Sequence, residues 1–508
     1  MTSLPSTITL DGRPLSVEAV AAVARGRVAI DIAPAARDRM RAARAVIDDI
    51  ADHDRAVYGI NTGFGSLSKV RIPPEQLATL QTNIVRSHAA GVGAPLDSDL
   101  VRAMMLLLAA SLVRGHSGVR PELVDRILAL LDAGVTPVVP SRGSVGASGD
   151  LAPLAHLALV LLGEGEVTFE GTRRETAPVL AGLGLEPIAL AAKEGLALLN
   201  GTHLMAACGA LAVFDLERIL RAATIASAMS LDGCRASHGP LDPRIHAARC
   251  QPGQIAVAAE LRRLLAGSEI VEAHREDDPR VQDPYCLRAI PQVLGAASDA
   301  IANGRRTIEY ELGAVTDNPL VFLDDAGGSE ILSGGNFHGM PLAIALDGLR
   351  VAACHIGGIS ERRVYWVLSG HDVHNPVTPY LAEDPGLQSG LMIAQYTAAA
   401  CVSEMQTIAN PASVANIPTS AGIEDYNSMG ATAGLLARRS VELLRDVIAI
   451  ELLTMAQAFE HQRPLRSGPD VETAHAAIRE RVPPLGDDRS PAPDIAAVSE
   501  LIETGGLG

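Results

Sequence analysis

The sequence has no long apolar run, no closely spaced cysteines and no cluster of basic residues, and each absence excludes a class of protein. The longest apolar stretches, over residues 103–113 and 151–162, are too short to span a bilayer. The N-terminus has neither the charged nor the apolar region of a signal peptide. A chain with a formal net charge of −17 and no run of Lys or Arg is a poor binder of phosphate, which needs clustered cations. We therefore expect a cytoplasmic protein that binds neither nucleic acid nor a membrane.

The cysteines and histidines do not form a recognisable metal site. The chain has six cysteines and no CxxC pair, so we expect reduced, mostly buried thiols rather than a disulfide framework or a zinc site. They are Cys208, Cys234, Cys250, Cys286, Cys354 and Cys401. The run from His371 to His374 holds two histidines at a spacing that suits a metal, but no third ligand is recognisable. We expect no metal.

Apolar residues at helical spacing dominate the chain. Proline at 121, a periodic apolar face to Leu131 and Gly134 beyond it predict one helix with both ends marked. Strand signals are few, over residues 7–10 and 167–169. Several periodic stretches are far longer than an average globular helix. They cover residues 193–231, 290–312, 340–367, 389–409 and 430–459. These patterns predict a mainly α protein built on a bundle of long helices.

The N-terminal part of the chain is more mixed and richer in loops than the rest. We therefore expect a smaller N-terminal domain over residues 1–110 and an elongated α-helical domain over residues 111–508. The pattern shows no internal repeat and no disordered linker. Residues 463–493, rich in proline and charge, suggest exposed connections between short C-terminal helices.

The tripeptide Ala147-Ser148-Gly149 is of the one type that can become an electrophile without an external cofactor. In a tight turn, the amide nitrogen of Gly149 can attack the carbonyl carbon of Ala147, and loss of water closes a five-membered ring. Loss of the Ser148 hydroxyl then leaves an exocyclic methylene, which gives a 4-methylideneimidazole-5-one group. Glycine is needed because its nitrogen is unhindered and its backbone adopts conformations that other residues avoid. Only serine or cysteine at the centre can eliminate to a methylene.

Such a tripeptide alone is common in loops, so the flanking residues decide its interpretation. Gly143 and Gly146 interrupt the loop, Asp150 is a favourable N-cap, and Pro153 falls in the first turn of a helix that begins at Leu151. The whole run from 143 to 156 resembles the signature of the histidine and aromatic amino-acid ammonia-lyase family. The resemblance implies a long-helix bundle of the ammonia-lyase, fumarase/aspartase-like type with a smaller mixed N-terminal domain. It also implies a methylidene-imidazolone made from residues 147–149, no external cofactor, and a homotetramer whose active sites are shared between subunits.

Two further runs resemble this family, although each has a plainer interpretation. The run from Tyr58 to Gly65 is by itself a glycine-rich turn; the resemblance makes it the mobile loop that delivers a catalytic tyrosine, Tyr58. The run Leu199-Asn200-Gly201-Thr202 is by itself a polar interruption of a long apolar helix, in which a buried Asn must find partners. The resemblance places Asn200 beside the electrophile and the substrate carboxylate.

Three more segments complete an ordered series that spans most of the chain. The resemblance makes Arg288 the bidentate partner of a substrate carboxylate, a role that suits a planar guanidinium. Gln282 and Tyr285, from the same segment, would line the same pocket. Phe337 would pack against the prosthetic ring, and Glu424 would lie close to the substrate amine.

The family's reaction is the non-oxidative elimination of ammonia from an L-α-amino acid. Tyr58 would remove the β-proton, and Arg288 would fix the carboxylate so that this C–H bond points at the base. Ser87-His88 resembles the histidine-specific members, in which His88 meets the imidazole, and Glu424 also favours histidine, giving urocanate. Ile423 and Met340 depart from the histidine enzymes, because both stand where polar residues are usual.

Several alternatives stay open. The same electrophile serves tyrosine and phenylalanine ammonia-lyases, and it serves aromatic amino acid 2,3-aminomutases, which add the ammonia back at the β-carbon. A helical binding protein with a degenerate pocket would not need the intact tripeptide and Tyr58. A fumarase-like lyase shares long helices and elimination chemistry but would not need the cyclising tripeptide.

Overall fold

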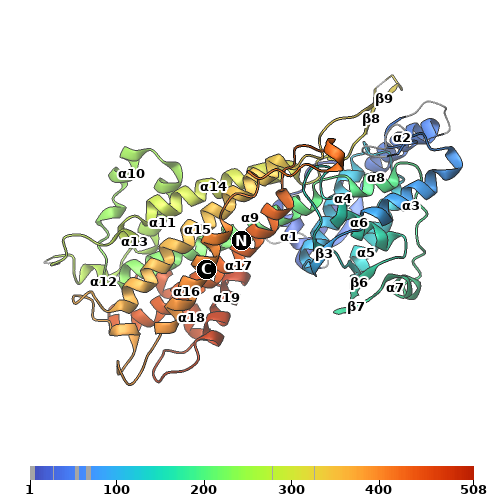
Figure 1. Ribbon diagram of the computed structural model, residues 1–508. Coiled ribbons are helices and arrows are strands. Elements are labelled where there is room, and N and C mark those ends of the chain that lie inside the picture. The colour runs from blue at the N-terminus through green and yellow to red at the C-terminus, as the bar shows by residue number, and fades with distance from the viewer. Residues whose placement is uncertain are drawn as a thin grey trace. The chain divides into compact units, whose positions relative to one another are not determined.

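The computed structural model describes residues 6–26, 28–51, 57–63, 70–276, 278–324 and 326–507 (Figure 1). Within these ranges the protein is mainly helical, as predicted, and its strands are short. The strand β1 (Thr7–Leu10) pairs in parallel with β2 (Ala29–Ile32), and the other pairs are antiparallel. Those are β3 (Val92–Pro95) with β5 (Pro140–Arg142), β4 (Thr136–Pro137) with β6 (Glu166–Phe169), β6 with β7 (Thr172–Glu175), and β8 (Leu320–Leu323) with β9 (Ser329–Leu332).

The chain forms two compact units, and each combines segments that are distant in sequence. Unit 1 comprises residues 1–214, 305–347 and 411–435, and unit 2 comprises residues 215–304, 348–410 and 436–508. This differs from the expected division at residue 110, which falls inside α4 (Ser98–Val113). That helix is buried along nearly its whole length, and the helices before and after it in sequence that pack on it all belong to unit 1, so this unit continues through it. Tyr58 and the tripeptide therefore belong to the same unit.

The helices of unit 1 surround α4. Its neighbours include α1 (Val17–Arg25) and α5 (Pro121–Ala133). Helix α5 begins at the expected proline and is followed by Gly134, whose φ of +72° is left-handed. Helix α3 packs against both α6 and α8, and these three helices carry much of the functional site. The remaining bounds are α2 (Pro34–Ala51), α3 (Leu77–His88), α6 (Leu151–Leu161), α7 (Thr176–Gly182) and α8 (Glu194–Leu199).

Four long helices each contain a boundary between the units: α9 (His203–Gly233), α14 (Ile290–Glu311), α15 (Met340–Ser369) and α17 (Gly430–Gln462). Unit 2 otherwise consists of helices and loops. Its helices are α10 (Pro243–Arg249), α11 (Pro252–Leu264), α12 (Glu269–Glu272), α13 (Tyr285–Arg288), α16 (Met392–Ile408), α18 (Pro469–Arg481) and α19 (Ala492–Thr504). The long helices expected after residue 290 are confirmed.

The helix predicted over residues 193–231 is instead broken at Asn200, Gly201 and Thr202. Helix α8 ends at Leu199, α9 begins at His203, and Asn200 has extended backbone. The apolar periodicity continues across the break and hides it. The physical reason for the break is tertiary, because the backbone of Gly201 pairs with that of Gly149 as a parallel β-bridge. Gly149 lies in the loop over residues 143–150, which we call the electrophile loop after the group expected to form there.

The structure corrects two expectations, one about the burial of the cysteines and one about the longest apolar stretch of the chain. All six cysteines are free, but only Cys208 and Cys234 are buried, so the thiols are not mostly buried. Helix α15 is long and apolar enough to cross a membrane by length and composition alone, whereas the sequence analysis took residues 103–113 and 151–162 as the longest apolar stretches. Of its most apolar window, 56% is buried inside the protein, as in the core helix of a soluble protein.

Candidate active site

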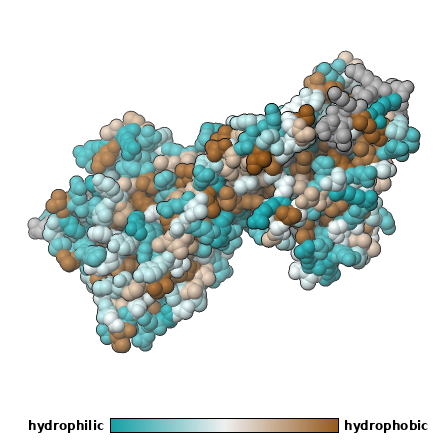
Figure 2. Space-filling model, viewed as in Figure 1, coloured by the Kyte–Doolittle hydropathy of each residue, from teal (hydrophilic) through white to brown (hydrophobic). Residues whose placement is uncertain are grey.

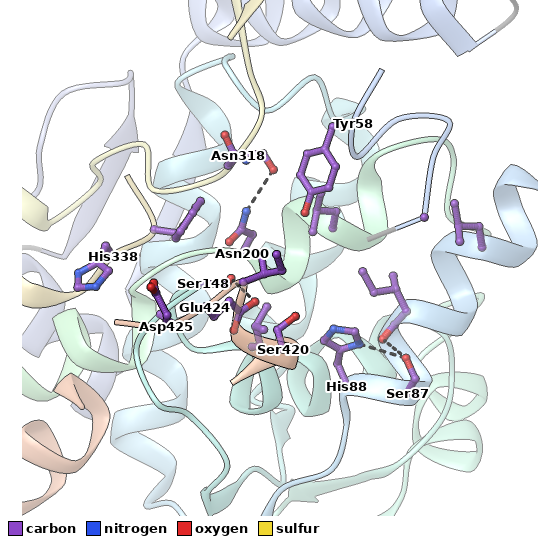
Figure 3. Close-up of a pocket in the computed structure, with 18 of the residues that line it drawn as sticks. Tyr58, Ser87, His88, Ser148, Asn200, Asn318, His338, Ser420, Glu424 and Asp425 are labelled. Atoms are coloured by element: carbon purple, nitrogen blue, oxygen red, sulfur yellow. Dashed lines mark hydrogen bonds between the residues drawn. The ribbon is translucent and has the colours of Figure 1, made fainter. Parts of the chain in front are cut away.

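A cavity of about 970 Å³ lies in unit 1 and collects side chains from segments that are far apart in the sequence (Figure 3). Helix α3, the loop before α6, the end of α8 and the turn around Glu424 all contribute to its wall. The predicted site residues among its lining are Tyr58, His88, Ala147, Ser148, Asn200, Phe337 and Glu424. Residues that are distant in sequence thus meet around the tripeptide.

The electrophile loop is fixed by a contact that only glycine permits. Gly149 has a left-handed φ of +72°, and a Cβ atom added there would lie 2.1 Å from the carbonyl oxygen of Gly201. The N–H of Asp150 donates to that same oxygen at 2.8 Å. On the other side of the tripeptide, the carbonyl of Gly146 accepts from the hydroxyl of Ser428 at 2.8 Å. The loop is therefore held at both ends.

Asp150 does not cap α6 with its side chain, contrary to the sequence expectation, but binds the start of α9. Its Oδ2 accepts from the backbone N–H groups of Leu204 and Met205 at 2.9 and 3.1 Å, and its Oδ1 accepts from the hydroxyl of Ser144 at 2.8 Å. A carboxylate is favoured at a helix N-terminus by the free N–H groups and the helix dipole. Complete burial nevertheless raises the pKa of Asp150 to about 6. This side chain ties the electrophile loop to α9.

Ser148 and Glu424 are in direct contact in the cavity (Figure 3). The Ser148 hydroxyl donates to Oε1 of Glu424 at 3.2 Å, and the hydroxyl of Thr419 donates to Oε2 at 3.0 Å. Residues 419 and 424 also pair through their backbones, which fixes the turn that carries the carboxyl group. A carboxyl group thus contacts the hydroxyl whose loss would leave the electrophilic methylene.

Asn200 is buried, and of its two side-chain amide atoms only the nitrogen has a hydrogen-bond partner among the described residues. Its Nδ2 donates to the carbonyl oxygen of Asn318 at 3.1 Å. Its Oδ1 has no hydrogen-bond partner among the residues that the structure describes. A buried amide oxygen without a partner is costly, so this acceptor is available to a donor inside the cavity.

Helix α3 presents His88 at its last turn. The Nδ1 of His88 lies 3.1 Å from the hydroxyl of Ser87, and burial lowers the pKa of His88, which favours the neutral imidazole. The chain after this helix is held from α6, because the N–H of Gly91 donates to Nε2 of His156 at 3.0 Å. A neutral imidazole can donate at one nitrogen and accept at the other, so it can pair with a polar ligand side chain.

Tyr58 lines the cavity (Figure 3), and the residues on either side of it form a turn. Gly59 has a φ of +75°, and a Cβ there would approach Leu196 to 2.7 Å and Pro319 to 2.9 Å. The N–H of Val57 donates to the side-chain oxygen of Asn61 at 2.8 Å. The last two residues of the run that suggested this loop, Phe64 and Gly65, lie outside the described residues.

Comparison with known proteins shows the family. Residues 15–480 match the family model for aromatic amino acid lyases. The chain belongs to the aromatic amino acid lyase family. A histidine ammonia-lyase from Anaeromyxobacter sp. (strain K) is 54% identical, with 99% of each chain covered, and one from Sorangium cellulosum is 50% identical, with 98% and 97% covered.

Solved structures of this family superpose over nearly the whole chain. A histidine ammonia-lyase from Trypanosoma cruzi has a TM-score of 0.90 at 41% identity and covers 99% of this chain and 94% of its own. A tyrosine aminomutase from Streptomyces globisporus has a TM-score of 0.92 at 37% identity, with 99% and 97% covered. The resemblance and the fold class inferred from the sequence are confirmed.

Lyases of this family use an electrophilic group made from their own chain, and the loop of this member fits such a group. Ala147 is buried, and Gly149 is turned by its left-handed backbone against Gly201. Ser148, between them, lines the cavity and has its hydroxyl on Glu424. A fixed turn with the central side chain facing a cavity is what cyclisation and use of the product require.

Gln282, Tyr285 and Arg288 belong to unit 2 of this lyase and do not line the cavity of unit 1. Tyr285 is 74% exposed, and the guanidinium of Arg288 lies over its ring at 4.6 Å from the centroid. The Nε of Arg288 has no hydrogen-bond partner within the described parts of the chain. This N–H group is therefore not used by the described residues.

Sequence reasoning missed several residues that line the cavity. Leu80 precedes His88 by two steps of four residues on α3, a helical spacing that would have found it, whereas Asn83 lines the cavity from the same helix without that spacing. Asn318 and Asp425 come from irregular loops and had no periodic signal. In the run from His371 to His374, where we expected no metal, Asp372 accepts a hydrogen bond from Arg280 at 3.0 Å.

Proposed function

We propose that this enzyme eliminates ammonia from L-histidine to give urocanate, by means of a methylidene-imidazolone formed from Ala147, Ser148 and Gly149. One observation carries the choice of substrate: His88 and Glu424 line the same cavity as Ser148. They are also electrostatically coupled, because Glu424 opposes the lowering of the pKa of His88 by burial. His88 suits an imidazole and would lose this partner around a phenyl ring, while Glu424 suits the amine of the substrate. The full-length histidine ammonia-lyases at 50–54% identity support the same choice.

The residues of the cavity divide the work of the reaction. The prosthetic group supplies an electrophile that makes the amino group a better leaving group. Tyr58 removes the β-proton as general base, and Glu424 exchanges protons with the amine. His88 pairs with the substrate imidazole, Asn200 offers its free amide oxygen, and Phe337 packs beside the reacting centre.

The active sites are shared between copies of the chain in a cytoplasmic homotetramer. Arg288 is the carboxylate clamp and Gln282 and Tyr285 accompany it, each supplied to the cavity by another copy. The exposed position of Tyr285 and the free Nε of Arg288 support this. Large apolar side chains are also exposed on two long helices, and apolar residues interrupt the hydrophilic surface in Figure 2. The exposed apolar side chains on these helices are Ile344, Val351 and Tyr365 on α15, and Ile393 and Tyr396 on α16.

Mixed tetramers test the sharing of sites. Tyr58→Phe and Arg288→Lys are each expected to be nearly inactive alone. Co-expressed in equal amounts, they are expected to recover up to about a quarter of wild-type turnover, because random assembly restores both residues at that fraction of sites. The measurement is turnover per site of the purified mixture, with each variant co-expressed with itself as control. No recovery would mean that one chain supplies both residues, and a fully active monomer in light scattering would exclude the tetramer.

Substrate choice is tested at His88. Replacing His88 with leucine is expected to lower the selectivity for histidine over phenylalanine by about 100-fold, since a polar partner of the imidazole is lost. The measurement is kcat/KM for histidine, tyrosine and phenylalanine, with Ser87→Ala as a control that keeps the imidazole. Unchanged selectivity would mean that His88 is only a packed helix residue.

The second candidate is a lyase or 2,3-aminomutase for an aromatic amino acid. It is favoured by Ile423, an apolar residue in the cavity wall, and by the match to a tyrosine aminomutase. Product chromatography separates the candidates. Accumulation of a β-amino acid, or faster turnover of tyrosine or phenylalanine than of histidine, would replace the histidine lyase by this alternative.

A further inference from the structure

In unit 2, Arg280 is the centre of a dense set of hydrogen bonds just before the segment that carries Arg288. Its side chain is 14% exposed. The Nε and Nη2 atoms donate to the two carboxylate oxygens of Asp278 at 2.9 and 2.8 Å, and Nη1 donates to Asp372 at 3.0 Å. The hydrogen bonds from Arg280 hold the pKa of Asp278 well below its usual range. A planar fork between two carboxylates defines one orientation of the guanidinium.

The same guanidinium closes the C-terminal end of the long helix α9. The N–H of Ala236 donates to the carbonyl of Leu231, and Arg235 has a left-handed φ of 49°, as in a Schellman motif. The backbone carbonyl groups of the last residues, Cys234 and Arg235, have no N–H donor within the helix and need one from elsewhere. Arg280 donates to the carbonyl oxygens of Cys234, at 3.2 Å, and of Arg235. A cation at this position is also favoured by the helix dipole.

Two further contacts hold the segment on either side of Tyr285. The carboxylate of Asp283 accepts from the N–H of Ser237 at 2.8 Å, just after the same helix end. The carbonyl of Cys286 accepts from Arg363 at 3.4 Å, and Arg363 is fully buried in an ion pair with Glu451. Hydrogen bonds thus hold Asp283 and Cys286 in place, while Tyr285 between them is exposed.

We propose that Arg280, clamped between Asp278 and Asp372, is a positioning residue that fixes the segment presenting Gln282, Tyr285 and Arg288 to the substrate. The proposal rests on the proposed function of Arg288 as carboxylate clamp. Only eight positions separate Arg280 from Arg288, and a bidentate clamp tolerates little displacement. Without the anchor, the segment samples more conformations and the substrate carboxylate is bound less tightly. This also gives a role to Asp372, in the histidine-flanked motif that suggested a metal.

The test compares Arg280→Met with Arg275→Met. Methionine keeps much of the apolar length in both, and Arg275 is an exposed residue whose ion pair with Glu272 lies outside the clamp. In Arg280→Met we expect KM for histidine to rise about tenfold, with kcat changing less, because orientation of the carboxylate is lost first. In Arg275→Met both constants stay near wild type. Arg280→Lys keeps the charge but not the fork and falls between them.

Hydrogen exchange gives a readout that needs no activity. The N–H groups of Leu287, Arg288 and Ala289 bond to the carbonyls of Pro284 and Tyr285 at 2.9–3.1 Å. Their exchange in the assembled protein is expected to speed up about tenfold in Arg280→Met and to stay unchanged in Arg275→Met. Asp372→Asn should act in the same direction, with little additional effect in the double variant, since both residues belong to one clamp.

Each outcome decides a different claim. Unchanged exchange and unchanged KM in Arg280→Met would overturn the positioning role. Loss of thermal stability with a normal KM and normal exchange over residues 284–289 would assign Arg280 a merely structural role and overturn it equally. Normal kinetics in Arg288→Lys would instead refute the clamp proposed for Arg288, while the exchange measurement would still decide whether Arg280 orders the segment.

Discussion

Replacing Ser148 with alanine is expected to abolish more than about 99.9% of turnover while leaving the fold intact, because the variant has no hydroxyl to eliminate. The mature wild-type protein should have a mass two waters, roughly 36 Da, below its encoded mass. The variant can lose one water at most, by ring closure alone. Among the described residues the Ser148 hydroxyl bonds to Glu424, and formation of the prosthetic group would remove that hydroxyl as well, so the fold should not depend on it.

Intact-mass spectrometry and circular dichroism check this prediction. Ser420→Ala is the matched control, since Ser420 lines the same cavity and its replacement should preserve the two-water deficit. Active wild-type protein at its full encoded mass would refute the prosthetic group. Turnover by the Ser148 variant near that of the control would show that the tripeptide is only a turn.

The sequence located the wall of the cavity well, and the reason is local chemistry. Tyr58, Ser148 and Glu424 stand in runs whose glycines and polar residues are unusual for a helical protein, and they meet at one place. The tripeptide carried most of the information, because its reactivity depends on residue type rather than on distant contacts. The roles of these residues in the reaction remain proposals that the variants test.

Features that depend on contacts between distant segments were not predictable. The break at Gly201 interrupts a continuous apolar pattern, and its cause, the pairing with Gly149, lies more than fifty residues away. Asp150 follows the local rule for an N-cap, yet its carboxylate binds the start of another helix. Local rules assign a polar side chain to its nearest backbone, whereas a buried carboxylate binds the free N–H groups that tertiary packing brings to it.

The division of the chain was missed for a related reason. A boundary was expected where loops give way to long helices, but compactness depends on which segments touch. Residues 305–347 and 411–435 return to the unit that contains the N-terminus and bring Asn318, Phe337 and Glu424 with them. The composition of the sequence does not change where these two segments begin or end. Arg280 was missed because its partners, Asp372 and the end of α9, are likewise distant in sequence.

Replacing Tyr58 with phenylalanine is expected to lower kcat by about 10²- to 10⁴-fold with little change in KM, because the ring that lines the cavity remains and only the hydroxyl is lost. The turn that positions it is set by the backbone of Gly59 and the side chain of Asn61, neither of which depends on the phenol. The variant should therefore keep the two-water mass deficit. Loss of turnover with the electrophile present would separate proton removal from formation of the prosthetic group.

Tyr426→Phe is the matched control, because Tyr426 also lines the cavity and its ring stacks on His338 at 6.4 Å between centroids. The stack needs no hydroxyl, so this variant should keep kcat within about threefold of wild type. Steady-state kinetics with histidine, followed by the absorbance of urocanate, measure both variants. If the two variants lose activity equally, the hydroxyl of Tyr58 has no special part and another group removes the β-proton. If Tyr58→Phe instead raises KM at an unchanged kcat, Tyr58 contributes to binding and is not the base.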